Sequence, residues 1–377
     1  MKIRRRIGLD VLAVLLLLVA TFASAADFQA AGAARELKGA PGIYEWRFAA
    51  TVGKSPFDKI ALHRIAKGPN PPAHPDAVVL YLPGTNMNGE VALDDPRYSF
   101  QVYLAEQGVD VWSMDYRTHF IPPETPQGDL SELAGWTNDL FESDIDAAAK
   151  FVSEKSGRGR LFVAGFSRGV EFAYLYAAMH PQGVAGIIAI DGFIPSRPMR
   201  AAPLEPGQYA DDVAGKHLTF DKRRALMQMV IDNPEQPAPI PKYKSARENL
   251  EHVMYDAAPG NGAFSNMQGG YSDAVVLAKL LIAYDRYWPS VQDGENPFTP
   301  QLLASLRASK IPVIAFASTN FGAQWPGQVE AASKSTGAPD PSFTKFDNWG
   351  HLDVLAGTKS ESQVFAPTAA WIKQHEK

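Results

Sequence analysis

Residues Leu161–Pro181, LFVAGFSRGVEFAYLYAAMHP, are the stretch that decides the fold. The stretch opens with a short apolar run, continues as Gly165–Gly169 (GFSRG) and ends in a helical pattern that Pro181 closes. This order predicts a buried strand, a sharp turn and a helix, with Ser167 at the apex of the turn.

A G-x-S-x-G pattern between a strand and a helix is typical of a nucleophile elbow, which holds the serine in a strained backbone conformation with its hydroxyl clear of the sheet. Gly165 and Gly169 lack Cβ atoms, so the strand and the helix can approach each other closely. The helix N-terminus favours negative charge beside the serine. Ser167 is therefore a candidate nucleophile. The alternative is an ordinary strand-to-helix turn whose glycines serve packing.

Buried strands alternate with helical segments on both sides of this stretch. Such an alternation, with short links, implies right-handed crossovers and a mostly parallel central sheet with helices on both faces. The apolar runs predict strands at residues 43–51, 60–66, 77–82, 109–116, 161–164, 184–190, 311–318 and 342–347, and the periodic segments predict helices at 98–107, 140–156, 170–180, 222–231, 273–284 and 368–375.

The alternation breaks after Gly192, and residues 193–308 contain no clean buried strand. We expect residues 26–192 and 309–377 to form an α/β core, and residues 193–308 to form a helical cap after the strand at 184–190. Ligands of open α/β folds bind at the edge that such a cap would cover. The cap is rich in aromatic residues and methionine, which either line an apolar cleft or form the cap's own core.

The first 25 residues are expected to be a signal peptide. Basic residues precede the apolar run Val11–Ala20, and Ala23–Ala25 (ASA) fits the small-x-small cleavage rule. The apolar run is too short to span a bilayer, so we expect a secreted or periplasmic protein with no stable membrane span. A net charge of −5 gives no reason to expect a nucleic-acid partner, and the absence of cysteine excludes disulfides and thiolate metal sites.

A serine hydroxyl becomes a good nucleophile only when a base removes its proton. Of the eight histidines, His351 is the best candidate base, because it follows the last expected strand and so lies at the same sheet edge as Ser167. His119, which also follows a strand, is the alternative.

These features resemble the α/β-hydrolase superfamily, in particular its serine esterases and lipases. The elbow Gly165–Gly169, the loop Pro83–Thr85 (PGT) and the segment Gly350–Asp353 (GHLD), which is similar to the G-H-x-D of many lipases, carry the resemblance. It covers nearly the whole chain apart from the signal peptide and the insertion.

The resemblance implies that Ser167 is the nucleophile and His351 the general base. It also implies an oxyanion hole made by the backbone N–H groups of Thr85 and Arg168. Two fixed donors of this kind stabilise a tetrahedral oxyanion. A plain Pro-Gly turn is the alternative for the loop that contains Thr85.

The acid of the triad departs from the common pattern. Most relatives place it after the strand at 311–318, but residues 319–325 contain no carboxylate and only Asn320 stands near that place. Asp191 ends the strand at 184–190, and some lipases resemble this by taking their acid from that strand end. A carboxylate there could accept the Nδ1–H of His351. Asp347 and Asp353 remain alternatives, although Asp353 is better interpreted as a residue that braces the loop.

Two further residues, Asp115 and Arg117, are expected to pair and to brace the same edge. The sequence contains no phosphate-binding loop, no dinucleotide-binding fingerprint and no H-E-x-x-H motif, so no cofactor and no metal are expected.

We therefore expect a serine hydrolase that cleaves a small carboxylic ester, with an apolar acyl or aryl group, through an acyl-enzyme. Two alternatives stay open. One is an acyltransferase or amidase that uses the same triad, and the other is a protein of this fold that binds an apolar ligand without catalysis.

Overall fold

The computed structural model describes residues 26–198, 210–212, 220–254 and 262–376. The expected signal peptide, residues 1–25, lies outside the described residues. Among the described residues, no helix combines the length and the hydrophobicity that crossing a bilayer requires.

A ten-stranded sheet runs through the described part of the chain, in the order β1-β3-β4-β6-β5-β7-β8-β11-β12, with β2 paired to β3. Its central and C-terminal strands, from β6 to β12, are parallel to one another, whereas β4 is antiparallel to β6. The strands are β1 Gln29–Ala30, β2 Arg35–Glu36, β3 Ile43–Thr51, β4 Lys59–Lys67, β5 Val78–Leu82, β6 Asp110–Asp115, β7 Leu161–Phe166, β8 Val184–Ile190, β11 Val313–Ser318 and β12 Ser342–Phe346.

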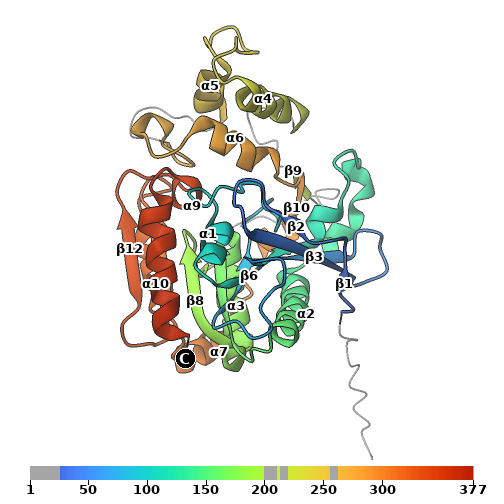
Figure 1. Ribbon diagram of the computed structural model, residues 1–377, viewed down its shortest axis with the longest axis vertical. Helices are drawn as coiled ribbons and strands as arrows, with labels where there is room; N and C mark the ends of the chain where they lie inside the picture. Colours follow the sequence, from blue (N-terminus) through green and yellow to red (C-terminus); the bar gives the residue numbers. More distant parts are fainter. Residues whose placement is uncertain (1–25, 199–209, 213–219, 255–261, 377) are drawn as a thin grey trace, which may run out of the picture.

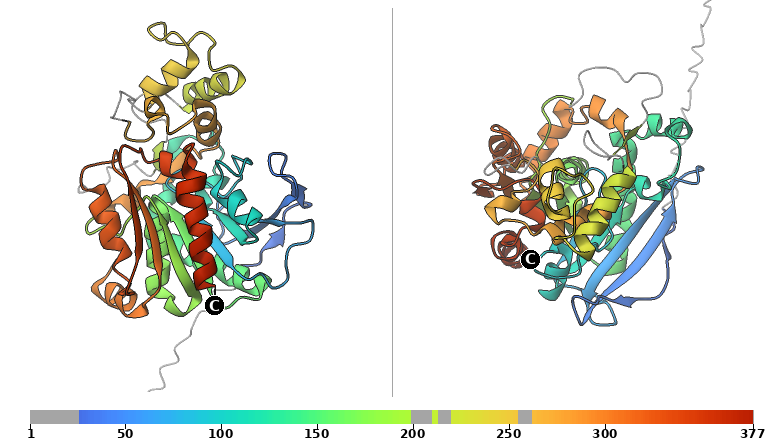
Figure 2. Two further views of the ribbon diagram at one scale, coloured as in Figure 1. Left: turned by 60° about the vertical axis from the view of Figure 1, so that its left-hand side comes forward. Right: turned by 90° about the horizontal axis from the view of Figure 1, so that it is seen from above.

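Helices cover both faces of this sheet (Figures 1 and 2). Successive residues of each buried strand point to opposite faces, so that Val79 and Tyr81 of β5 join one apolar core and Val78 and Leu80 join the other. The first core takes in α1 Phe100–Glu106 and α10 Ala366–His375, and the second takes in α2 Asn138–Ser156, α3 Arg168–Met179, α7 Pro300–Ser309 and α8 Trp325–Ser333. The fold class expected from the sequence is confirmed.

The insertion lies over the edge where the parallel strands end (Figure 1, top). Two hydrogen bonds place it there: the Asp285 N–H donates to the Asn86 carbonyl oxygen, in the loop after β5, and the His351 N–H, in the loop after β12, donates to the Ala263 carbonyl oxygen. Its described elements include β9 Ala210–Asp212, α4 Phe220–Asp232, α5 Ala246–Asn249, α6 Ala274–Ile282 and β10 Tyr287–Pro289.

Two features of the insertion differ from the sequence-based expectation. Strands β9 and β10 pair as a short antiparallel ribbon, where no clean strand was expected. Their three-residue length is too short to give a hydrophobic pattern. Helix α7, of which all but the last residue was predicted as cap, packs against α3 of the core.

Candidate active site

Ser167 stands at the turn between β7 and α3 in a strained conformation, with φ 55° and ψ −118°. A positive φ in a non-glycine residue costs about 1–3 kcal/mol and persists only where its surroundings impose it. Here the Ser167 N–H donates to the Ile190 carbonyl oxygen (3.0 Å), and the Val170 N–H donates to the Ser167 carbonyl oxygen (3.0 Å). The backbone on both sides of the serine is thus held.

The glycines of the motif permit this tight turn. A Cβ atom on Gly165 would lie 2.2 Å from the backbone of Gly169, and one on Gly169 would lie 1.9 Å from the Leu82 carbonyl oxygen. No side chain fits at either distance, so strand, helix and the neighbouring strand end meet only because both positions are glycine.

The loop Pro83–Thr85 lies against the elbow. A Cβ atom on Gly84 would lie 3.1 Å from the Cβ of Ser167, and the Tyr116 hydroxyl fixes the loop by donating to the Pro83 carbonyl oxygen (3.0 Å). Thr85 follows Gly84, and Arg168 follows Ser167. The two residues predicted to form the oxyanion hole therefore both adjoin the Gly84–Ser167 contact.

The side chain of Arg168 anchors the start of α3. Although it carries a charge, it is buried, and it pairs with Glu171 (3.1 Å) and with Asp293. Burial raises the pKa of Glu171, against the opposing pull of Arg168. Asp293 belongs to the 3₁₀ helix η7 Ser290–Gly294, so this pair ties the elbow to the segment before α7.

His351 and Asp191 lie together at the same sheet edge. The His351 Nδ1 atom is 2.6 Å from the Asp191 Oδ2 atom, and the two side chains are 5% and 0% exposed. The aromatic ring of Phe166, the residue before Ser167, stacks on the imidazole with the ring centroids 4.6 Å apart. His351 therefore stands next to the elbow.

The carboxylate of Asp191 is held from the end of β11. The Ser318 N–H donates to its Oδ1 atom (2.7 Å) and the Ser318 hydroxyl to its Oδ2 atom (2.7 Å), while the Trp325 indole N–H donates to Oδ1 (2.9 Å). Buried carboxylates are stabilised by donors of this kind. Asp191 thus has a fixed orientation with Oδ2 facing His351.

No protein-family model matches the chain, and no curated protein matches its sequence. Solved structures do match. A candidate lipase from Sulfolobus solfataricus is 27% identical over 92% of this chain and 99% of its own, with a TM-score of 0.77. Rv0554 from Mycobacterium tuberculosis is 12% identical over 84% of this chain and 94% of its own, with a TM-score of 0.50. An alpha/beta hydrolase fold protein from Nakamurella multipartita is 15% identical over 83% and 95%, with a TM-score of 0.46.

The first of these matches and the strand order together decide the fold. The chain has the α/β-hydrolase fold. The fold implied by the elbow, the PGT loop and the GHLD segment is confirmed.

Within this hydrolase fold, the two other candidate carboxylates point elsewhere. Asp347 is exposed and pairs with Lys345 (2.9 Å). Asp353 is buried and accepts hydrogen bonds from the Gly350 N–H (2.6 Å), the Asn266 N–H (2.9 Å) and the Ser272 hydroxyl. Burial raises the pKa of Asp353 to about 6, although these donors oppose the shift. Asp353 therefore braces the loop that carries His351 and ties it to the insertion.

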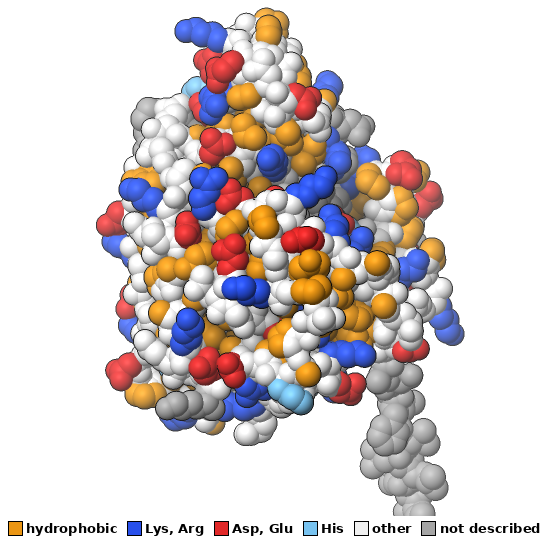
Figure 3. Space-filling view, in the orientation of Figure 1, with side chains coloured by type: hydrophobic (Ala, Val, Ile, Leu, Met, Phe, Trp, Pro, Cys, Tyr) orange, Lys and Arg blue, Asp and Glu red, His pale blue; other side chains and the backbone are white. Residues whose placement is uncertain are grey.

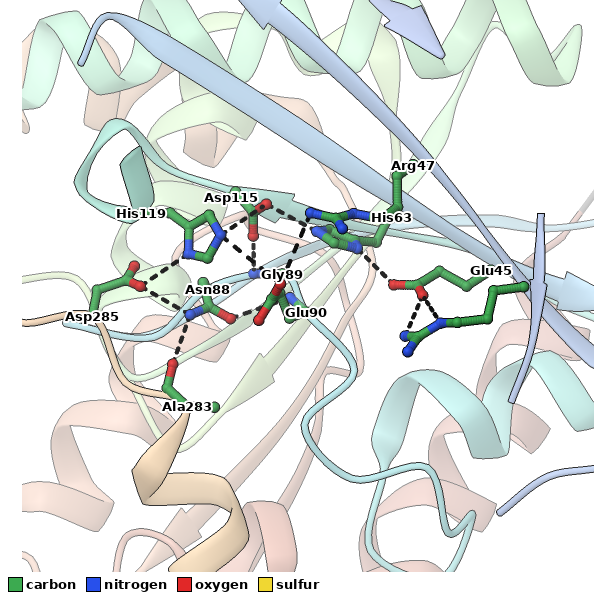
Figure 4. Close-up of polar contacts among 11 residues, drawn as sticks. Glu45, Arg47, His63, Asn88, Gly89, Glu90, Asp115, His119, Ala283 and Asp285 are labelled. Carbon is green, nitrogen blue, oxygen red and sulfur yellow. Dashed lines mark hydrogen bonds and ion pairs between the residues drawn. The ribbon is translucent and has the colours of Figure 1, made fainter. Parts of the chain in front are cut away.

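His119, the alternative base, belongs to a separate polar cluster (Figure 4). Its Nδ1 atom lies 3.0 Å from the Oδ1 atom of Asp285, three residues after the end of α6, and its Nε2 atom lies 3.9 Å from the Asp115 Oδ2 atom. Burial lowers its pKa, but the hydrogen bond to Asp285 and the charge of Asp115 outweigh burial and raise the pKa to about 9. A protonated histidine between two carboxylates is poorly suited to act as a base at neutral pH.

The expected pairing of Arg117 with Asp115 is wrong. Arg117 pairs with Asp144 and Asp58, whereas Asp115 accepts from the Gly89 N–H (2.7 Å) and pairs with His63 (2.9 Å). Strand β6 ends at Asp115 and Arg117 begins the 3₁₀ helix η1 Arg117–Phe120, so the alternation that would place residues i and i+2 on one face stops between them.

Among the described residues, most of the cap's large apolar side chains pack inside the cap or against the core. Met227, Met267, Tyr287, Trp288 and Phe298 are buried, whereas Phe264 is 41% exposed and lies beside His351 (ring centroids 6.3 Å apart). A cavity of about 40 Å³ lies between α6 and the segment after β5, and its lining does not include Ser167 or His351.

Two surface features bear on partners. Acidic and basic side chains are interspersed over the face drawn in Figure 3, with no large area of one sign. Among the described residues, no group of three or more His, Cys, Asp or Glu side chains is arranged to hold a metal ion.

Proposed function

We propose that this protein is a serine hydrolase that cleaves carboxylic esters through an acyl-enzyme, with Ser167, His351 and Asp191 as its triad. The observation that carries the proposal is the buried His351–Asp191 pair, 2.6 Å apart, beside a strained serine elbow. The elbow, a base and an oriented carboxylate are the three parts that acyl transfer by serine requires. The match to a candidate lipase supports esters as the substrate class.

In the proposed reaction, the Ser167 hydroxyl attacks the ester carbonyl carbon while His351 Nε2 takes its proton. Asp191 accepts the Nδ1–H, which fixes the tautomer that leaves Nε2 free and stabilises the imidazolium that forms. The tetrahedral intermediate collapses when the protonated His351 gives its proton to the leaving alkoxide. Water then attacks the acyl-enzyme by the same relay and releases the acid.

The backbone N–H groups of Thr85 and Arg168 are proposed to stabilise the oxyanion. A donor that is fixed before the reaction costs no reorganisation in the transition state, and losing one costs about 10²–10³ in rate. The contact between Gly84 and Ser167, and the buried anchoring of the Arg168 side chain, support this role.

The proposed substrate is a small ester with an apolar acyl or aryl group. Phe264 and Phe321, which both lie against His351, support an apolar environment for the reacting ester. Secretion, or residence in the periplasm, is proposed from the sequence of residues 1–25 alone.

The test is hydrolysis of p-nitrophenyl esters from short to long acyl chains by the mature protein. Ser167→Ala should abolish turnover, Asp191→Asn should lower kcat by about 10³–10⁴, and Ser362→Ala, at an exposed serine, should change nothing. Turnover that survives Ser167→Ala would overturn the assignment of the nucleophile. If no ester is cleaved, amides and acyl acceptors are assayed next, and inactivity with all of them favours a binding protein.

A further inference from the structure

The segment after β11, up to the first residue of α8, lacks the carboxylate that most hydrolases of this fold carry there, yet it lies against the His351–Asp191 pair. Its residues 319–325 read TNFGAQW, and two of its side chains touch the pair. Phe321 contacts the imidazole, and Trp325 contacts both the imidazole and the carboxylate.

The imidazole of His351 lies between two aromatic rings. The Phe321 ring is 4.2 Å from it and inclined by 10°, and the Phe166 ring is 4.6 Å from it and inclined by 28°. Two rings this close and this parallel cannot occupy one face of an imidazole without overlapping, so they stack on opposite faces. Stacking on both faces leaves the imidazole little freedom to rotate or tilt, and the electron-rich ring faces attract an imidazolium cation.

Trp325 completes this arrangement. Its indole ring meets the imidazole edge-on (5.6 Å, 87°) and the Phe321 ring edge-on (4.5 Å, 86°). Its N–H donates to the Asp191 Oδ1 atom, so that Oδ1 is shared by Trp325 and the Ser318 N–H, and Oδ2 is left to the Ser318 hydroxyl and His351. One residue therefore contacts both the proposed base and the proposed acid.

We propose that Phe321 and Trp325 are positioning residues: Phe321 clamps the His351 imidazole against Phe166, and Trp325 orients the Asp191 carboxylate toward it. This inference rests on the proposed function, because it gives both residues their effect through His351. The loop supplies an aromatic clamp at the place where most relatives supply an acid.

The kinetic test compares variants that keep the shape of each side chain but remove one interaction. Phe321→Leu keeps bulk without an aromatic face, Phe321→Tyr keeps the face, and Trp325→Phe keeps the ring without the N–H. We expect kcat on p-nitrophenyl acetate to fall about tenfold in Phe321→Leu and Trp325→Phe with KM unchanged, since small misplacements of a catalytic group cost such factors. Phe321→Tyr should remain within about twofold of wild type.

Matched controls lie on β3. Phe48 is also half-buried and stacked on an aromatic ring, that of Trp112 (5.5 Å, 29°), and Trp46 is half-buried. Phe48→Leu and Trp46→Phe should leave kcat unchanged. Equal losses in Phe321→Leu and Phe321→Tyr, or equal losses in these controls, would reduce the role of Phe321 to packing and overturn the proposal.

A second measurement does not require turnover. Aromatic ring currents shift the C–H proton resonances of a sandwiched imidazole to high field, so Phe321→Leu should move the His351 resonances to lower field and Phe321→Tyr should not. Unmoved His351 resonances in Phe321→Leu would overturn the clamp. The proposed function has its own test, because it fails if Ser167→Ala keeps the esterase activity. The His351 resonances would still test the clamp in that case. If Phe321→Leu does not fold, the kcat of Trp325→Phe tests the proposal instead: an unchanged kcat would overturn the role of Trp325.

Discussion

A buried ion-pair cluster should make the stability of this protein fall at alkaline pH. His63, on β4, lies between Glu45 of β3 (Nδ1 to Oε1, 2.7 Å) and Asp115 of β6 (Nε2 to Oδ2, 2.9 Å), and all three side chains are buried (Figure 4). Burial lowers the pKa of His63, but the two carboxylates outweigh burial and raise the pKa to about 9. His63 is therefore protonated at neutral pH.

The direction and size of the effect follow from linkage. An unfolded histidine has a pKa near 6.5, so the folded protein binds this proton more tightly than the unfolded chain does. The resulting stabilisation is fully present below about pH 6.5 and is lost as the pH rises through about 9. The difference between the two pKa values corresponds to about 3 kcal/mol.

The assay is urea unfolding of the wild type and His63→Gln between pH 6 and pH 10, with the exposed His74→Gln as control. Glutamine is neutral at every pH, so the wild type should exceed His63→Gln in unfolding free energy at pH 6 and approach it at pH 10. The gap should shrink by about 3 kcal/mol, and an equal change in the gap to His74→Gln would show that the effect does not come from the buried cluster. A gap between wild type and His63→Gln that does not change with pH would refute the reasoning.

Three further substitutions test local features of the fold. Asp353→Ala leaves two backbone N–H groups and a hydroxyl without their acceptor, so the free energy of unfolding in urea at pH 7 should fall by about 3 kcal/mol. Gly169→Ala places a Cβ 1.9 Å from a backbone oxygen and should prevent soluble expression, whereas Gly159→Ala, with nothing within 4 Å, should express normally. Lys310→Gly relieves a φ of 57° after α7 and should raise the unfolding free energy by about 0.5–1 kcal/mol, measured in the same way.

The sequence predicted the sheet well because its strands are continuous apolar runs. Strands buried on both faces, such as Val78–Leu82 and Val184–Ile190, need apolar residues at every position, and this leaves a pattern that few other structures share. The elbow was equally readable, since its two glycines mark a contact that admits no side chain.

The partners of the polar side chains were not readable in the same way. Asp191 was the candidate acid, but the choice between it, Asp347 and Asp353 depended on β8, β11 and β12 being successive strands of the sheet, although β8 is far from the other two in sequence. Phe321 and Trp325 gave no signal, because an aromatic residue in a loop or at the start of a helix is compatible with many environments. Arg117 pairs with Asp144 on α2 and not with Asp115, which is two residues away in sequence. Tertiary contacts of this kind depend on strand order, which local patterns do not encode.

The roles of Ser167, His351 and Asp191 remain predictions that one measurement tests directly. Residues 26–377 and the Ser167→Ala and His351→Ala variants of the same chain are incubated with a fluorophosphonate, and the adduct is located by peptide mass spectrometry. The proposed mechanism predicts one adduct on the peptide that contains Ser167, none in Ser167→Ala, and labelling slowed by at least about 10²-fold in His351→Ala. An unlabelled wild type, or an adduct that survives Ser167→Ala, would contradict it.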